Sequence, residues 1–220
     1  AGILIMVIPG LVSGILLALL KVPSFITTRG VGILVEGAAL LLSKGYPIAG
    51  QPDYLGQLGN GSLINWNPGK WFTFFNVPPT AVQADLQSNI PLIPNIVFIT
   101  IIVTAVCWFI LAKTQFGQHL YAIGGNFKAA LRAGIPVRRT LIKVYILASV
   151  LAGIAGVVWA ARFTSGAYNG GETTPMTAIA ATVIGGASLF GGEGRVIGTI
   201  VGALIIATIQ DGLVVLGVLP

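Results

Sequence analysis

Few residues of this sequence could carry out chemistry on their own. The chain has one histidine, His119, and one cysteine, Cys107. A zinc cluster needs several His or Cys ligands, and a His-based triad needs a histidine beside a nucleophile, so neither is predicted. Cys107 lies in an apolar run and is expected to be an inert packing residue, and His119 is expected to be a solvated loop residue. We therefore predict no catalytic residue, no metal and no cofactor.

A glycine-rich stretch at residues 185–194 has some likeness to a nucleotide-binding loop. The phosphate-loop pattern G-x-x-x-x-G-K-[ST] occurs nowhere in the chain, and this stretch follows an apolar segment, not a strand of a βαβ unit. We predict a sharp turn between two membrane helices, in which glycines adopt positive φ. The glycines of this turn are Gly185, Gly186, Gly191, Gly192 and Gly194.

Two acidic residues interrupt apolar segments. A buried charge without a partner is costly, so such residues are functional candidates. Arg29 lies seven positions before Glu36, on the same helical face and about 10 Å away along the axis. Glu36 either pairs with Arg29 or a neighbouring helix, or lines a polar pathway. Asp211 lies near a helix end, which favours a place at the membrane interface.

The composition predicts the environment of these residues. Hydrophobic residues make up 55% of the chain and charged residues 8%, whereas soluble domains average about 25% charged residues. A water-facing surface could not be built from so few charges. The sequence predicts an integral membrane protein of the all-α class, a polytopic transmembrane helical bundle. The net charge of +6 is too small and too confined to form a nucleic-acid-binding face.

Apolar runs predict where the chain crosses the membrane. A bilayer core of about 30 Å needs roughly 20 helical residues. The predicted spans are residues 2–20, 30–43, 92–112, 144–161 and 196–217; residues 177–190 are short for a full crossing and fit either a crossing or a re-entrant segment. We therefore expect five or six membrane segments in a single domain over residues 1–220. The apolar start, without a preceding basic stretch, is expected to be internal to a longer protein.

Small residues spaced four apart predict close packing between these helices, because both members of a pair share one helix face. The pairs are Gly10/Gly14, Ser149/Gly153, Ala152/Gly156, Gly194/Gly198 and Gly198/Gly202.

Basic residues predict the orientation. Residues 113–143 contain no acid and six of the twelve basic residues, namely Lys113, Lys128, Arg132, Arg138, Arg139 and Lys143. The positive-inside rule places this loop in the cytoplasm and the Pro-rich loop at residues 44–91 outside. Aromatic residues around Lys70 are expected at the membrane surface; they are Trp66, Trp71, Phe72, Phe74 and Phe75.

A short helix is predicted inside the basic loop. Asn126 is a good N-cap for a helix over residues 127–133, and Gly134 ends it. Its residue types fit two interpretations equally. It is either a docking element for a cytoplasmic partner or an interfacial helix that binds anionic membrane lipid through Lys128 and Arg132.

Several separated blocks resemble the ribose/xylose-type monosaccharide ABC importer permeases. Residues 122–126 (AIGGN), with the alanines and Gly-Ile that follow, resemble the cytoplasmic coupling loop of that family. Residues 22–28 (VPSFITT) are similar to its VPxFIxT stretch, and residues 178–195 to its AIAAxxxGGxSLxGGxG segment. Where the family usually has Leu-Gly and then Arg-Gly, this sequence has Arg29-Gly30 and Glu36-Gly37. The long external loop is more similar to the xylose branch.

The resemblance implies the transmembrane subunit of an ATP-driven importer that carries a monosaccharide across the bacterial inner membrane. It implies separate cytoplasmic ATP-binding subunits, which hydrolyse the ATP, a second permease copy, and a periplasmic sugar-binding protein. The coupling residues that it implies are Gly124, Gly125, Asn126, Ala129, Ala130, Arg132 and Gly134, with both alanines seated in a groove of the ATPase. A branched-chain amino-acid importer permease, and an ion-coupled secondary transporter or channel that uses Glu36 or Asp211, remain alternatives.

Overall fold

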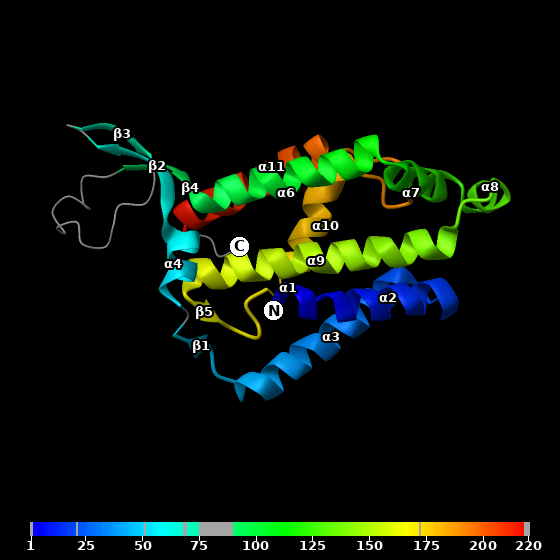
Figure 1. Ribbon diagram of the computed structural model, residues 1–220, viewed down its shortest axis with the longest axis horizontal. Coiled ribbons are helices and arrows are strands. Elements are labelled where there is room, and N and C mark those ends of the chain that lie inside the picture. The colour runs from blue at the N-terminus through cyan, green and yellow to red at the C-terminus, as the bar shows by residue number, and fades with distance from the viewer. Residues whose placement is uncertain are drawn as a thin grey trace. The chain divides into compact units, whose positions relative to one another are not determined.

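The computed structural model describes residues 2–20, 22–50, 52–67, 70–74, 90–171 and 173–217. Most of these residues are helical (Figure 1). The chain divides into two compact units: the first comprises Ala1–Gly10, Thr28–Val103 and Ile146–Gly170, and the second Leu11–Thr27, Thr104–Tyr145 and Gly171–Pro220. The all-α helical class predicted from composition is confirmed.

Within the described residues, five helical segments are long and apolar enough to cross a membrane. They are Gly2–Leu20, which consists of α1 (Gly2–Ile5) and α2 (Val7–Leu20), then α3 (Ser24–Ser43), α6 (Asn95–Lys113), α9 (Val137–Phe163) and α11 (Val196–Val215). The five predicted spans are confirmed, with α3 and α9 starting before the apolar runs begin. At the start of α3, the Thr27 backbone N–H and hydroxyl both donate to the Pro23 carbonyl, at 3.1 and 3.2 Å.

The short apolar segment is a helix of eleven residues, α10 (Thr174–Ile184). At 1.5 Å per residue it is about 16 Å long, roughly half of the bilayer core. The predicted segment extended to residue 190, but the helix ends at Ile184, and the Gly185 N–H donates to the Ala181 carbonyl at 2.9 Å. This helix is too short to cross the core alone.

In the second unit, the predicted loop at residues 113–143 is largely helical. It contains α7 (Gln115–Gly125), α8 (Phe127–Arg132) and the first turns of α9. A small apolar core joins the three helices through Ile123, Ala130 and Val137, with Ile135 and Leu141 packed against it. The segment is therefore a packed helical element, of which only α8 was predicted from the sequence.

The small residues of α10 and α11 bring these two helices into backbone contact. A Cβ built on Gly198 would meet the Gly185 carbonyl oxygen, and one built on Gly202 would meet the Ala181 carbonyl oxygen. The Gly198/Gly202 pair therefore lies at a true interface, as predicted. In the first unit, a Cβ built on Gly153 would lie 3.1 Å from the Cβ and Cγ atoms of Met6. Nothing lies within 4 Å of a Cβ built on Gly156.

The segment of the first unit that the charge pattern predicts to be external has regular structure that was not predicted from the sequence. It holds helix α4 (Asp53–Asn60) and an antiparallel sheet of order β3-β2-β4, with β2 at Ser62–Asn67, β3 at Lys70–Phe74 and β4 at Ile90–Pro94. A second pair joins β1 (Ile48–Ala49) to β5 (Ser165–Gly166). Prolines argue against central strands, but β4 lies at the sheet edge, where they are tolerated.

Some predictions concern parts of the chain that the structure does not describe. The aromatic cluster is one of them, because Phe75 and the side chains of Trp66, Trp71, Phe72 and Phe74 lie outside the described residues.

Candidate functional site

Helix α8 is defined by a cap at each end. The Asn126 backbone is extended, with φ −153°, and its side-chain oxygen accepts the Ala129 N–H at 3.0 Å. At the other end, Gly134 has φ +76°, its N–H donates to the Leu131 carbonyl at 3.2 Å, and the Ile135 N–H donates to the Ala130 carbonyl at 3.1 Å. This paired pattern is a Schellman motif. The predicted cap and stop residues are confirmed, and the helix ends at Arg132, one residue before the predicted end.

The two alanines of α8 lie on different faces. Ala130 is 4% exposed and belongs to the core with Ile123 and Val137, whereas Ala129 is exposed. The expectation that both alanines face a partner is therefore wrong for Ala130. Phe127 and Leu131, four residues apart and 53% and 59% exposed, present an apolar face to the outside. The side chains of Lys128 and Arg132 are also exposed.

Helix α7 positions α8 and was missed in the sequence. The Thr114 hydroxyl caps it by accepting the Gly117 N–H at 3.4 Å, and Gly117 packs directly on the Leu111 carbonyl. His119 is half-buried on this helix, so the expectation of a solvated loop residue is wrong. The signal that could have revealed α7 is Thr114, a favourable N-cap residue that follows a basic helix end.

Two glycine motifs that were predicted separately meet in the second unit. A Cβ on Gly124 would collide with the Gly192 backbone nitrogen, and a Cβ on Gly192 would lie 2.8 Å from the Gly125 Cα. The Tyr121 hydroxyl donates to the Gly194 carbonyl at 2.8 Å, across 73 residues of sequence. The end of α7 is therefore fixed to the turn between α10 and α11. Tyr121 was not among the predicted site residues.

The turn glycines have two different roles. Gly186, Gly191 and Gly192 have φ of +87°, +94° and +80°, which confirms the predicted positive φ. Gly185 has φ −71°, so its role is different: the absence of a Cβ allows its close backbone contact with Gly198.

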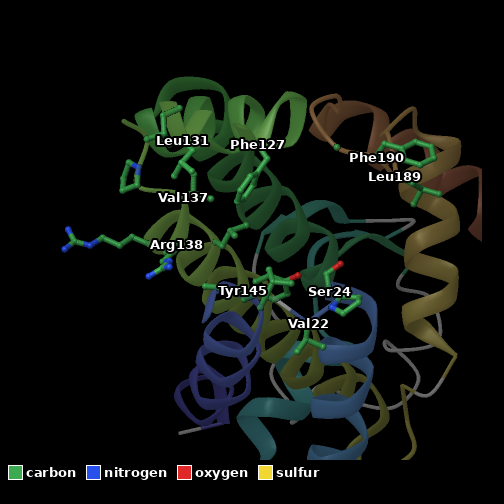
Figure 2. Close-up of a pocket in the computed structure, with 17 residues that line it drawn as sticks. Val22, Ser24, Phe127, Leu131, Val137, Arg138, Tyr145, Leu189 and Phe190 are labelled. Carbon is green, nitrogen blue, oxygen red and sulfur yellow. The ribbon is translucent and has the colours of Figure 1, made fainter. Parts of the chain in front are cut away.

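A cavity of about 1190 Å³ opens beside α8 within the second unit. Figure 2 shows side chains of α8, the start of α9, the segment before α3 and the α10–α11 turn around it. The side chains of Ser24 and Tyr145 are hydrogen-bonded there. The labelled lining residues are Val22, Ser24, Phe127, Leu131, Val137, Arg138, Tyr145, Leu189 and Phe190. The lining is mainly apolar and includes Arg138 and Arg139.

Neither Glu36 nor Asp211 is among the residues that line this cavity. Glu36 is half-buried and Arg29 is exposed, both on α3, and no ion pair joins them in the described part of the chain. Asp211 is exposed, one turn before the end of α11. Among the described residues, no group of three or more His, Cys, Asp or Glu side chains could hold a metal ion.

Within the described residues, five membrane-length helices, one helix of half that length and one short capped helix define the class of a polytopic helical membrane protein. The chain belongs to the family described as "Branched-chain amino acid transport system / permease component", whose model matches residues 1–220. The family match confirms the predicted permease family. Together with the five membrane-length helices, it also confirms the predicted multi-pass location in the inner membrane.

Curated relatives match over nearly the whole chain. It is 36% identical over 208 residues to the ribose import permease protein RbsC of Bacillus subtilis (strain 168), covering 94% of this chain and 56% of the relative. It is 35% identical over 209 residues to the protein of that name in Escherichia coli (strain K12), covering 95% and 58%. It is 34% identical over 243 residues to the xylose transport system permease protein XylH of Haemophilus influenzae, covering 95% and 65%.

The chain thus spans little more than half the length of the two ribose permeases that it matches. No solved structure matches it.

Proposed function

We propose that this chain is part of the transmembrane subunit of an ATP-driven importer for a monosaccharide of the ribose or xylose class. The observation that carries this proposal is the similarity to ribose and xylose permeases over 94–95% of the chain. The family description names branched-chain amino acids, but these relatives are named for sugars, which favours a sugar over an amino acid. An ion-coupled transporter built on Glu36 or Asp211 finds no support in the relatives.

The geometry of α8 supports a role in coupling to a cytoplasmic ATP-binding subunit. ATP is hydrolysed on that separate subunit, and a second permease copy and an external sugar-binding protein complete the importer. Phe127, Ala129 and Leu131 supply an exposed contact surface, and Lys128 and Arg132 supply charge that orients a partner. Ala130 holds the helix on its own core, so it acts as an anchor within the subunit.

The chain also offers a route from α8 into the membrane. Gly124 and Gly125 end α7 in backbone contact with Gly191 and Gly192, which lie in the turn between α10 and α11. Backbone contacts cannot slide past each other as flexible side chains do, so a displacement of α8 would carry the turn with it.

Transport by the full permease in lipid vesicles tests the proposal. With a purified ATP-binding subunit and a purified sugar-binding protein of the importer, labelled ribose or xylose should enter only when ATP is present. Uptake driven by an ion gradient without ATP would reject the importer assignment. Labelled leucine serves as the competing substrate, and its preferential uptake would favour the amino-acid alternative.

A change at Ala129 tests the docking role of α8 against lipid binding. Ala129→Trp places a large side chain on the exposed face, and we expect at least about tenfold slower uptake with an unchanged thermal midpoint. Ala129→Ser is the matched control, because it keeps the residue small. Lipid binding predicts instead little effect of Ala129→Trp and a strong effect of neutralising Lys128 and Arg132 together. Normal uptake by Ala129→Trp would reject docking through α8.

A further inference from the structure

The turn between α10 and α11 displays two large apolar side chains. Leu189 is 74% exposed and Phe190 is 97% exposed. The backbone around them is held by local hydrogen bonds: the Ser188 N–H donates to the Glu193 carbonyl at 3.0 Å, the Gly191 N–H to the Ser188 carbonyl at 3.2 Å, and the Phe190 N–H to the Ser188 hydroxyl at 3.2 Å. Phe190 is therefore presented by an ordered turn.

This turn keeps a fixed position relative to α8. Gly191 and Gly192 are in backbone contact with the end of α7, and Tyr121 donates to the Gly194 carbonyl. Leu189 and Phe190 line the same cavity as Phe127 and Leu131 of α8 (Figure 2). The four apolar side chains thus border one hollow on the molecule, contributed by two elements far apart in sequence.

The position of this surface argues against lipid as its occupant. On the proposed orientation, the apolar run of α9 begins at residue 144, seven residues after the helix starts at Val137. Seven residues extend about 10 Å, whereas the headgroup region adds roughly 5–8 Å on each side of the core. Helix α8 lies between the last residue of α7 and Val137, the first residue of α9, and projects beyond those two helix ends (Figure 1). On that orientation, and with α9 along the membrane normal, its apolar face therefore lies at the aqueous side of the headgroups.

The charge around the hollow indicates the chemistry of a partner. Arg138 and Arg139 are among its lining residues, and Lys128 and Arg132 are exposed on α8. Glu193 is the acidic residue of the turn itself. A protein surface with an apolar pocket and an acidic rim would complement this arrangement, because rim charges guide association while apolar groups are buried.

We infer that the ATP-binding subunit docks on two elements at once, α8 and the turn at residues 188–191, with Phe190 inserted in an apolar pocket of that subunit. This inference rests on the proposed function and extends its contact surface to a second element. The turn leads directly into α10 and α11. A partner that binds both elements is therefore connected to these membrane helices through Phe190 as well as through α8.

Binding of the purified ATP-binding subunit to the full permease in nanodiscs tests this inference. Phe190→Ala should raise the dissociation constant at least about tenfold, as expected for the loss of a central aromatic anchor. Val215→Ala is the matched control, because Val215 is 87% exposed at the opposite end of α11. It should leave binding unchanged. The thermal midpoint of each variant should equal that of the parent protein, since neither side chain is buried.

A third variant, Leu131→Ala, separates this inference from the proposed function. If Leu131→Ala weakens binding and Phe190→Ala does not, α8 docks alone and the two-element surface is rejected. If neither variant weakens binding, docking through α8 fails as well. If Phe190→Ala reduces the phosphatidylglycerol retained by the permease while subunit binding stays unchanged, the turn binds lipid and the inference is overturned.

Discussion

Replacing Gly124 with alanine should destabilise the contact between α7 and the α10–α11 turn. The added Cβ would collide with the Gly192 nitrogen and lie 3.1 Å from the Gly192 Cα and 3.3 Å from the Gly191 carbonyl carbon. All three are backbone atoms, and the Tyr121 hydrogen bond to Gly194 holds the turn in place. The neighbours therefore cannot yield as a flexible side chain would.

Two effects of opposite sign determine the magnitude. Alanine favours a helix over glycine by roughly 0.5–1 kcal/mol, whereas overpacking a close contact costs about 1–3 kcal/mol. Because the obstructing atoms are backbone, the upper part of the second range applies. The free energy of unfolding should fall by about 1–2 kcal/mol, which lowers the thermal midpoint by about 2–8 °C for a chain of this size.

The next residue of the same helix supplies the control. Nothing lies within 4 Å of a Cβ on Gly125, so Gly125→Ala should leave the thermal midpoint unchanged or slightly higher. The measurement is thermal unfolding of the purified full permease in detergent, followed by circular dichroism, with sugar uptake in vesicles as a second readout. Equal midpoints for Gly124→Ala and Gly125→Ala would refute the backbone contact.

Three further changes test other parts of the structure. Single cysteines at Arg138 and Gln57, in a cysteine-free background, should react with a membrane-impermeant thiol reagent on intact cells only at position 57; the reverse pattern would invert the topology. The losses in thermal midpoint from Glu36→Gln and Arg29→Gln should add in the double variant, because no ion pair joins the two residues in the described structure; a coupled loss would contradict this. Asn126→Ala should lower the free energy of unfolding by about 1 kcal/mol, whereas Asn126→Asp should preserve it; equal stability of both would exclude a capping role.

The membrane helices could be predicted from the sequence because the bilayer imposes a length and an apolar composition on each of them. The ends of α8 could be predicted because Asn126 and Gly134 act locally, within three or four residues of the helix they limit. The positive φ of Gly191 and Gly192 followed from the same kind of local argument.

The rest depends on contacts that no local pattern reveals. Helix α7 contains Gly117, Gly124 and Gly125, which have low helix propensity, and Gly117 is accommodated because the backbone at Leu111 lies directly against it. The contact between Gly124 and Gly192 joins residues 68 positions apart and could not be inferred from either motif alone. The sequence alone predicts a partner contact for Ala130, because an alanine on a short helix suits the groove of a partner and its own core equally well.

The proposed coupling depends on α8 having little stability of its own. Helices shorter than about 12 residues are marginal in isolation, and α8 has six. Its geometry therefore comes from its caps and from Ala130, so a force on α8 passes through Ile123 to α7 and on to the turn. On the proposed orientation the turn lies at the cytoplasmic end of α10, and α10 extends only about 16 Å from it. Helix α10 is therefore too short to carry the chain across the roughly 30 Å core by itself, and irregular backbone within the core is tolerated only beside protein or water. A partner that moves α8 would thus move α10 as well, because α10 ends at the turn that is in backbone contact with α7.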